Sequence, residues 1–220
     1  MKMKVLIAAA LALACGAAWS ADSGFYVGAG LGWSDVSSNV KYTYKDSEGF
    51  KDSSSDKFSG SDVAYTFVVG YDFNKYAAVE LGYLDLGKPS DTFKDNSEPP
   101  YVGKDKVDIT LNGIDLAVVG KYPFADSFDV HAKLGVIWWT PKVTDVYTET
   151  DSTDSTYFYK DTSTIESDST DLLIGVGASY MWGEHLVLSF DWQHIELGGS
   201  LEVAGIDNTD AWLFGAAWKF

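Results

Sequence analysis

The stretch TDAWLFGAAWKF, residues 209–220, decides the fold because its residues alternate between two kinds. Large aromatic residues dominate every second position, whereas the intervening positions are mostly small and include a lysine. The first set is Trp212, Phe214, Ala216, Trp218 and Phe220, and the second is Ala211, Leu213, Gly215, Ala217 and Lys219. This period of two predicts a β-strand with two different faces. A soluble sandwich would turn its apolar face inward and would not need to end on an aromatic residue.

Seven more alternating segments precede this one along the chain. They cover about 25–34, 63–73, 77–86, 108–122, 128–140, 171–182 and 186–197. Their connections alternate between long and short, and the long polar ones lie near 36–60, 87–107, 141–169 and 198–208. Outer-membrane barrels have long external loops and short periplasmic turns. Residues 22–220 are therefore predicted to form one all-β domain, an eight-stranded antiparallel up-and-down transmembrane β-barrel with those four segments as exposed loops.

Residues 1–21 have the pattern of a secretory signal peptide. Lys2 and Lys4 precede the apolar run 5–14, and Ala18-Trp19-Ser20 supplies a small-x-small cleavage site. The run is shorter than the roughly 20 residues of a spanning helix. The single cysteine, Cys15, lies in this segment and is either lost with it or lipidated. The exported domain is expected to lack a disulfide framework.

The charge of the chain excludes some partners. The formal net charge is −16, and every one of the 16 basic residues is lysine. Nucleic acid is not expected as a partner, because phosphate binding needs a basic surface. A site built on a bidentate guanidinium clamp is excluded as well.

The two faces of the predicted strands indicate which side meets lipid. Large aliphatic and aromatic residues share one face, and the other collects the charged residues Glu80, Asp115, Lys121, Lys133 and Asp191. Charges inside and aromatics outside are favoured only when the outside is lipid, where a closed barrel satisfies every backbone hydrogen bond. The charged set is expected to fill a lumen that is only wide enough for side chains. Aromatics near strand ends are expected to form interfacial girdles: Trp33, Phe73, Tyr122, Trp138 and Trp182.

Three segments carry a resemblance to a known family. Residues 24–32 (GFYVGAGLG), 79–87 (VELGYLDLG) and 217–220 (AWKF) resemble the small barrel of OmpA-like and opacity-type outer-membrane proteins. The resemblance covers essentially the whole mature chain and implies the fold more than a specific function. It implies location in the outer membrane of a Gram-negative bacterium. The resemblance is limited to the transmembrane domain of the family, and no peptidoglycan-binding domain is expected.

The resemblance also implies roles for particular residues. The barrel-assembly machinery would act during insertion on an assembly signal formed by Trp212, Phe214, Trp218 and Phe220. Glu80 matches an interior glutamate that pairs with cations on facing strands in the family. Ser189 stands where the family often has an inward arginine, so a switching salt-bridge gate is not implied.

The function expected from the sequence is a structural or surface-interaction role. The partners would be outer-membrane lipid and lipopolysaccharide, with an unknown extracellular ligand of the acidic loops; no cofactor, metal or enzyme activity is expected. The alternatives are a narrow pore for small solutes, a soluble ligand-carrying barrel, and a lipid A-modifying enzyme. The last would need a His-x-Ser pair, but His194 is followed by Ile195 and Glu196.

One acidic stretch could also bind divalent cations, which prefer oxygen ligands. Its carboxylates are Asp145, Glu149, Asp151, Asp154, Asp161, Glu166 and Asp168. A spaced calcium-loop signature with its turn glycine is missing from this stretch. The sequence therefore favours a solvated acidic loop over a cation site.

Overall fold

The computed structural model describes residues 23–45, 51–95, 100–154, 156–166, 168–197 and 208–220. Eight antiparallel strands close into a barrel in the order β1-β12-β11-β10-β7-β6-β3-β2. Their bounds are β1 Gly24–Lys45, β2 Lys51–Asn74, β3 Ala77–Asp85, β6 Asn112–Ala125, β7 Phe128–Trp139, β10 Ser169–Trp182, β11 Leu186–Glu196 and β12 Asn208–Lys219. The predicted fold class is confirmed. Within the described residues no helix is long and apolar enough to cross a membrane.

The barrel closes between its first and last strands. The β1–β12 ladder runs from Tyr26 opposite Lys219 to Ser37 opposite Asn208, so neither strand leaves a free edge within the barrel wall. Outward side chains along the wall are large, apolar and exposed, as at Leu31 and Phe67, while the inward neighbours are small, polar or buried. This is the inside-out alternation that a lipid-embedded barrel requires.

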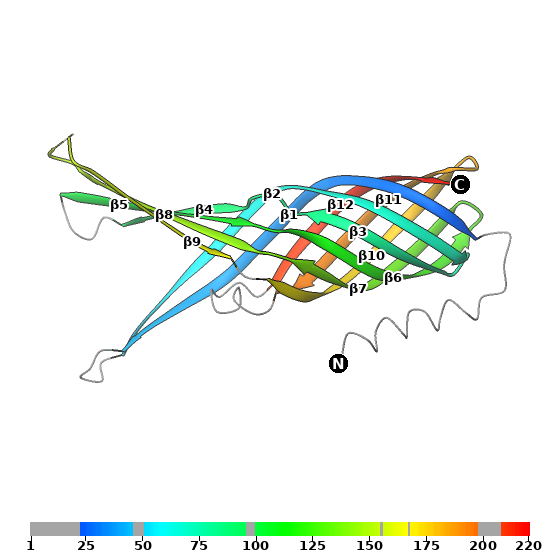
Figure 1. Ribbon diagram of the computed structural model, residues 1–220, viewed down its shortest axis with the longest axis horizontal. Coiled ribbons are helices and arrows are strands. Elements are labelled where there is room, and N and C mark those ends of the chain that lie inside the picture. The colour runs from blue at the N-terminus through cyan, green and yellow to red at the C-terminus, as the bar shows by residue number, and fades with distance from the viewer. Residues whose placement is uncertain (1–22, 46–50, 96–99, 155, 167, 198–207) are drawn as a thin grey trace.

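The two ends of the barrel differ in length and shape. The short turns and Phe220 lie at one end, and at the other end strands extend far beyond the wall (Figure 1). β1 and β2 continue as a paired hairpin to Lys45 opposite Lys51. By the rule for outer-membrane barrels, the extended end is external and the turn end periplasmic.

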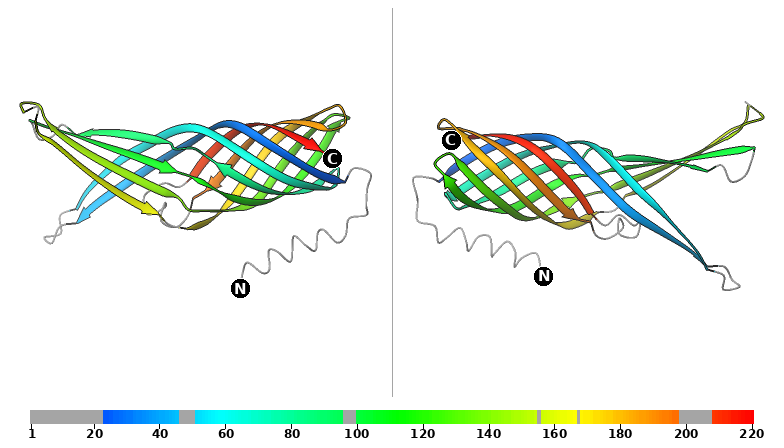
Figure 2. Two further views of the ribbon diagram at one scale, coloured as in Figure 1. Left: turned by 45° about the horizontal axis from the view of Figure 1, so that its top comes forward. Right: turned by 180° about the vertical axis from the view of Figure 1, so that it is seen from behind.

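A second sheet also projects from the external end. It contains β4 (Ser90–Asp95), β5 (Tyr101–Thr110), β8 (Lys142–Asp151) and β9 (Phe158–Glu166), in the order β4-β5-β8-β9. We call it the external sheet. Figure 2 shows that it and the β1–β2 hairpin diverge as two separate arms.

These arms correct the expected loops. Much of 36–60, 87–107 and 141–169 forms strands rather than irregular loop. The Ser, Thr, Asp and Lys residues there bring no sustained apolar alternation, so the pairing of these strands could not be predicted from alternation. The fourth segment, 198–208, lies outside the described residues except for Asn208, as do the predicted signal peptide and Cys15.

Apolar side chains fill the external mouth of the barrel. This mouth cluster is buried and contains Val36, Ala64, Leu84, Leu86, Ile109, Leu111, Ile137, Trp139, Leu173, Ile195, Leu197, Ala211 and Leu213. Phe93, Val107 and Val143 of the external sheet pack against it. The external sheet is therefore anchored on the apolar cluster through the inward side of its base.

Candidate functional site

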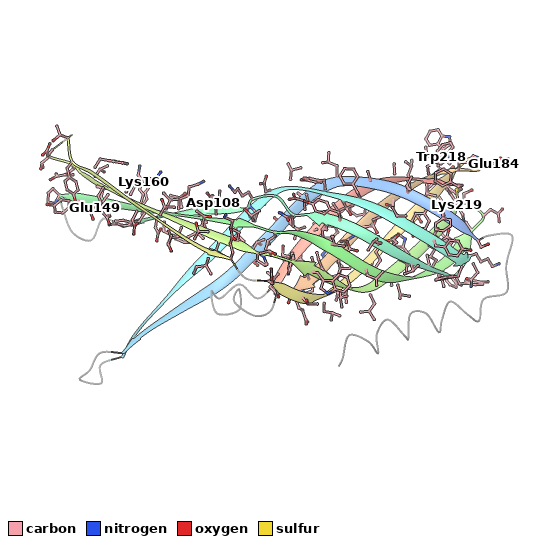
Figure 3. The ribbon with its side chains drawn as sticks, viewed as in Figure 1. Asp108, Glu149, Lys160, Glu184, Trp218 and Lys219 are labelled. Atoms are coloured by element: carbon pink, nitrogen blue, oxygen red, sulfur yellow. The ribbon has the colours of Figure 1, made fainter. Side chains whose placement is uncertain are left out.

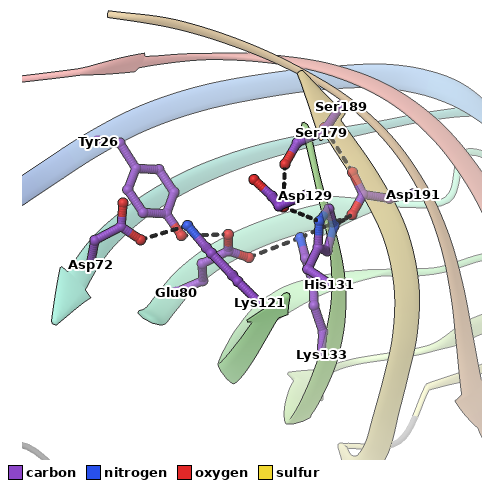
Figure 4. A network of polar contacts seen from close by, with 10 residues as sticks. All are labelled: Tyr26, Asp72, Glu80, Lys121, Asp129, His131, Lys133, Ser179, Ser189 and Asp191. Atoms are coloured by element: carbon purple, nitrogen blue, oxygen red, sulfur yellow. Dashed lines mark hydrogen bonds and ion pairs between the residues drawn. The ribbon is translucent and has the colours of Figure 1, made fainter. Parts of the chain in front are cut away.

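Polar side chains from all eight barrel strands meet inside the barrel on the periplasmic side of the mouth cluster. Figure 4 shows most of them close together, with the Asp72–Lys121 pair beside a larger group around Glu80 and Lys133. We call the whole set the lumen network; its members are Tyr26, Asp72, Glu80, Lys121, Asp129, His131, Lys133, Ser179, Ser189, Asp191 and Lys219. Inward positions of adjacent strands fall side by side because the ladder pairs them, so each strand adds one or more members.

Lys133 is the centre of the lumen network. Its Nζ lies 2.9 Å from Glu80 Oε2 and 3.4 Å from Asp191 Oδ1. Tyr26 donates its hydroxyl hydrogen bond to Glu80 Oε1 at 2.6 Å, and Ser189 donates to Asp191 Oδ2 at 2.8 Å. Both carboxylates thus have an ammonium and a hydroxyl partner, which is how buried charges are normally accommodated.

His131 links this centre to β10. Its Nε2 lies 2.7 Å from Asp191 Oδ1, and its Nδ1 lies 3.5 Å from Asp129 Oδ1. Ser179 donates a 2.6 Å hydrogen bond to that same Asp129 oxygen. The histidine is therefore held between two carboxylates and bridges β7 and β11.

A second group of charges lies nearer the periplasmic end. Asp72 accepts Lys121 Nζ at 2.6 Å on one oxygen and Lys219 Nζ at 2.8 Å on the other. Lys121 Nζ also lies 5.2 Å from the centroid of the Tyr26 ring, within cation–π range. Tyr26 therefore connects the two groups.

Gly70 makes room for Tyr26. A Cβ at this position would collide with the Tyr26 ring, which lies against the β2 backbone on its way to Glu80. A side chain at residue 70 would push the ring away and break the contact with Glu80. Glycine on the inward face is thus needed for the bulky partner on the facing strand.

The charged residues that the sequence predicted to share the lumen do not all contact one another. Glu80, Lys133 and Asp191 meet directly, whereas Lys121 binds Asp72. Asp115 is buried on the inward face, where its carboxylate lies against Gly82. The sequence alone does not assign Tyr26, Asp72, Asp129 or Lys219 to this network, since their partners depend on strand register.

The predicted aromatic residues face outward or lie at strand ends. Trp33 and Trp138 lie toward the external end, and Phe73, Tyr122 and Trp182 lie toward the turns. Of the predicted assembly signal, Phe214, Trp218 and Phe220 are well exposed and Trp212 is half-buried. Figure 3 places Trp218 at the periplasmic end, away from Lys160 of the external sheet. Their girdle and assembly roles stay predictions.

The lumen network lines a cavity of about 590 Å³. The cavity reaches Asp126 and Ser127 in the β6–β7 turn and is bounded toward the outside by Leu213 of the mouth cluster. Among the described residues no group of three His, Cys, Asp or Glu is arranged to hold a metal ion. The residues lining this cavity contact one another through ion pairs and hydrogen bonds across the lumen.

The architecture defines a class: an eight-stranded outer-membrane β-barrel with a charged interior. A family profile described as the outer membrane protein beta-barrel domain matches residues 6–220. The chain therefore belongs to that family, and the protein is located in the outer membrane.

Curated relatives agree with this assignment, and a solved structure shares the fold. The chain is 32% identical over 141 residues to outer membrane protein A of Serratia marcescens, covering 62% of this chain and 36% of that protein. It is 26% identical to outer membrane protein A of Yersinia pseudotuberculosis serotype I (strain IP32953), covering 84% and 44%. The chain thus spans less than half the length of these relatives. OprG of Pseudomonas aeruginosa shares the fold at 18% identity with a TM-score of 0.50, covering 90% of this chain and 97% of OprG.

Proposed function

We propose that the protein is a sealed outer-membrane scaffold that acts through its external sheet and hairpin rather than by conducting solutes. The observation that carries this proposal is the mouth cluster, whose 13 side chains are each at most 5% exposed. Ions need a continuous polar path, and an apolar constriction excludes water and stops conduction. The cavity inside the barrel is on the periplasmic side of that constriction.

A lipid-modifying activity has less support. His194 Nδ1 lies 2.9 Å from Asp210 Oδ1, which also accepts the Trp192 indole N–H at 3.1 Å. An acyl-transfer site also needs a nucleophile within hydrogen-bond reach of its histidine. In the described part of the chain, the contacts of His194 are made with Asp210 and the Trp192 ring, so this pair fits a role in anchoring β11 to β12.

Conductance in planar bilayers tests the proposal. The wild-type protein is expected to show no single-channel steps, because the mouth cluster blocks the polar path. A variant with Leu84→Ser, Ile137→Ser and Leu213→Ser, which makes the mouth polar and smaller, is expected to conduct. Ser189→Ala changes the cavity below the mouth and serves as the control that should stay silent. Defined steps from the wild-type protein would overturn the proposal.

A further inference from the structure

The external sheet has two faces that continue the two faces of the barrel wall. Thr110 pairs with Lys142, and Gly113 pairs with Trp139, so the β5–β8 ladder continues the β6–β7 ladder in one register. The face that contains Ile109 packs on the mouth cluster and continues the lumen side. The opposite face continues the lipid-facing side and is directed outward over the surrounding membrane surface.

Charge is divided between these two faces. The outward face carries five lysines and two acidic residues: Lys94, Lys104, Lys106, Lys142, Lys160, Asp108 and Glu166. The inward face has no lysine among its described side chains and carries Asp91, Asp105, Asp145, Glu149, Asp151 and Asp161. The neighbouring Asp105 carboxylate, together with burial, raises the pKa of Asp145 to about 6. In a chain with a net charge of −16, the outward face is thus locally basic.

Three of these lysines form a row across the sheet. Lys94 lies directly opposite Lys104, Lys104 lies opposite Thr148, and Thr148 lies opposite Lys160. With strands about 4.8 Å apart, the row places three ammonium groups within roughly 15 Å. The two remaining lysines are neutralised nearer the barrel, Lys106 by Asp108 at 2.7 Å and Lys142 by Glu166 at 2.6 Å.

The lysines of the row repel one another, and an anionic ligand would remove this repulsion. Like charges directly opposite each other on adjacent strands destabilise a sheet. Lys94, Lys104 and Lys160 are exposed, and within the described residues none of them forms an ion pair. Thr92 and Thr162 lie in the next row and Thr148 lies within the row itself, so hydroxyl groups flank the charges. Ammonium groups with neighbouring hydroxyls suit phosphate groups on a sugar chain.

We propose that the Lys94–Lys104–Lys160 row binds the phosphate groups of the lipopolysaccharide sugars that surround the barrel. The outward face is directed at this anionic layer, and lysine binds phosphate as a point charge. Lysines on this face also offset the repulsion that a strongly acidic protein meets in an anionic surface. The proposal uses the external position of the sheet but does not depend on whether the barrel conducts.

Nucleic acid fits the row less well. Proteins that bind single strands add aromatic side chains on which the bases stack. Phe158 is the one aromatic residue among the described side chains of the outward face. A sulfated polysaccharide from outside the cell carries anionic groups similar to phosphate, so the experiment tests heparin separately.

The test is calorimetric titration of the full chain, folded in a neutral detergent, with soluble deacylated lipopolysaccharide oligosaccharide that retains its phosphates. Each lysine near an anionic surface contributes about fivefold in affinity, so Lys104→Gln with Lys160→Gln is expected to weaken binding about 30-fold. Lys104→Arg should keep the affinity, and the matched control Lys75→Gln, in the β2–β3 turn, should not change it. Binding should weaken with added salt.

Several outcomes would overturn the proposal. Equal affinity for dephosphorylated oligosaccharide would remove phosphate as the recognised group. Equal losses in the double variant and in Lys75→Gln would mean that the row is not the site. Binding of heparin in place of the oligosaccharide would assign the row to a partner outside the cell. Heat-modifiable gel migration checks that each variant is folded, and the conductance experiment is scored independently.

Discussion

Replacing Lys133 with Met is expected to lower the free energy of unfolding by about 3–5 kcal/mol, because it leaves two buried carboxylates without their ammonium partner. The Lys133, Glu80 and Asp191 side chains are 11%, 10% and 9% exposed. Methionine has a similar length and fills the same space, so the change removes charge more than volume. Urea-induced unfolding in detergent or lipid, followed by tryptophan fluorescence, measures the loss.

Two further variants separate charge from packing at this site. Lys75→Met replaces an exposed lysine in the β2–β3 turn and is expected to change the stability by no more than about 0.5 kcal/mol. Adding Glu80→Gln to Lys133→Met removes one of the two buried carboxylate charges that lost their ammonium partner, and it should recover part of the lost stability. A Lys133→Met protein as stable as Lys75→Met would show that the lumen network does not hold the barrel together.

Replacing Trp139 with Ala is expected to cost about 3–5 kcal/mol of stability through the cavity left in the mouth cluster. Trp139 is 4% exposed, and its indole N–H donates a 2.6 Å hydrogen bond to Asp171 Oδ2. The same urea titration measures the effect. The loss should be accompanied by weaker protection from hydrogen exchange in β5 and β8, whose inward residues pack on the mouth cluster.

Trp139→Phe is the matched variant. It keeps most of the apolar volume but removes the hydrogen bond to a carboxylate, and it is expected to cost about 1.5–3 kcal/mol. Equal losses in the Ala and Phe variants would mean that the hydrogen bond, and not the packing of the mouth cluster, supplies the stabilisation.

The barrel could be predicted from the sequence because its alternation is continuous. Strands such as 25–34 and 209–220 alternate large outward residues with small or charged inward ones. This alternation can be read directly from the order of residues in the sequence. The external sheet could not be predicted in this way. Lys104, Thr148 and Lys160 are polar residues in polar surroundings, and their strand structure comes from the pairing of β5 with β8 and of β8 with β9.

The lumen network could likewise be predicted from the sequence only in part. Alternation alone predicts that the Glu80, Lys133 and Asp191 side chains face the lumen. Strand register decides which of the inward side chains pair with one another. Asp72 takes both Lys121 and Lys219 because β2 lies near β12 and β6 at the periplasmic end. Without the register, Asp115 looked equivalent to Glu80, although Glu80 is the one that binds Lys133.

Side-selective labelling of a cysteine inside the barrel tests most directly whether the mouth is sealed. Thr66 on β2 lines the cavity below the mouth cluster, and Thr148 lies on the external sheet. Thr66→Cys and Thr148→Cys would each be placed in a chain with Cys15→Ser, reconstituted in vesicles of known orientation and treated with a membrane-impermeant maleimide. The sealed scaffold predicts that the cysteine at 66 reacts only from the turn side and the cysteine at 148 only from the external side. Reaction of the cysteine at 66 from the external side, at a rate close to that of the cysteine at 148, would contradict it.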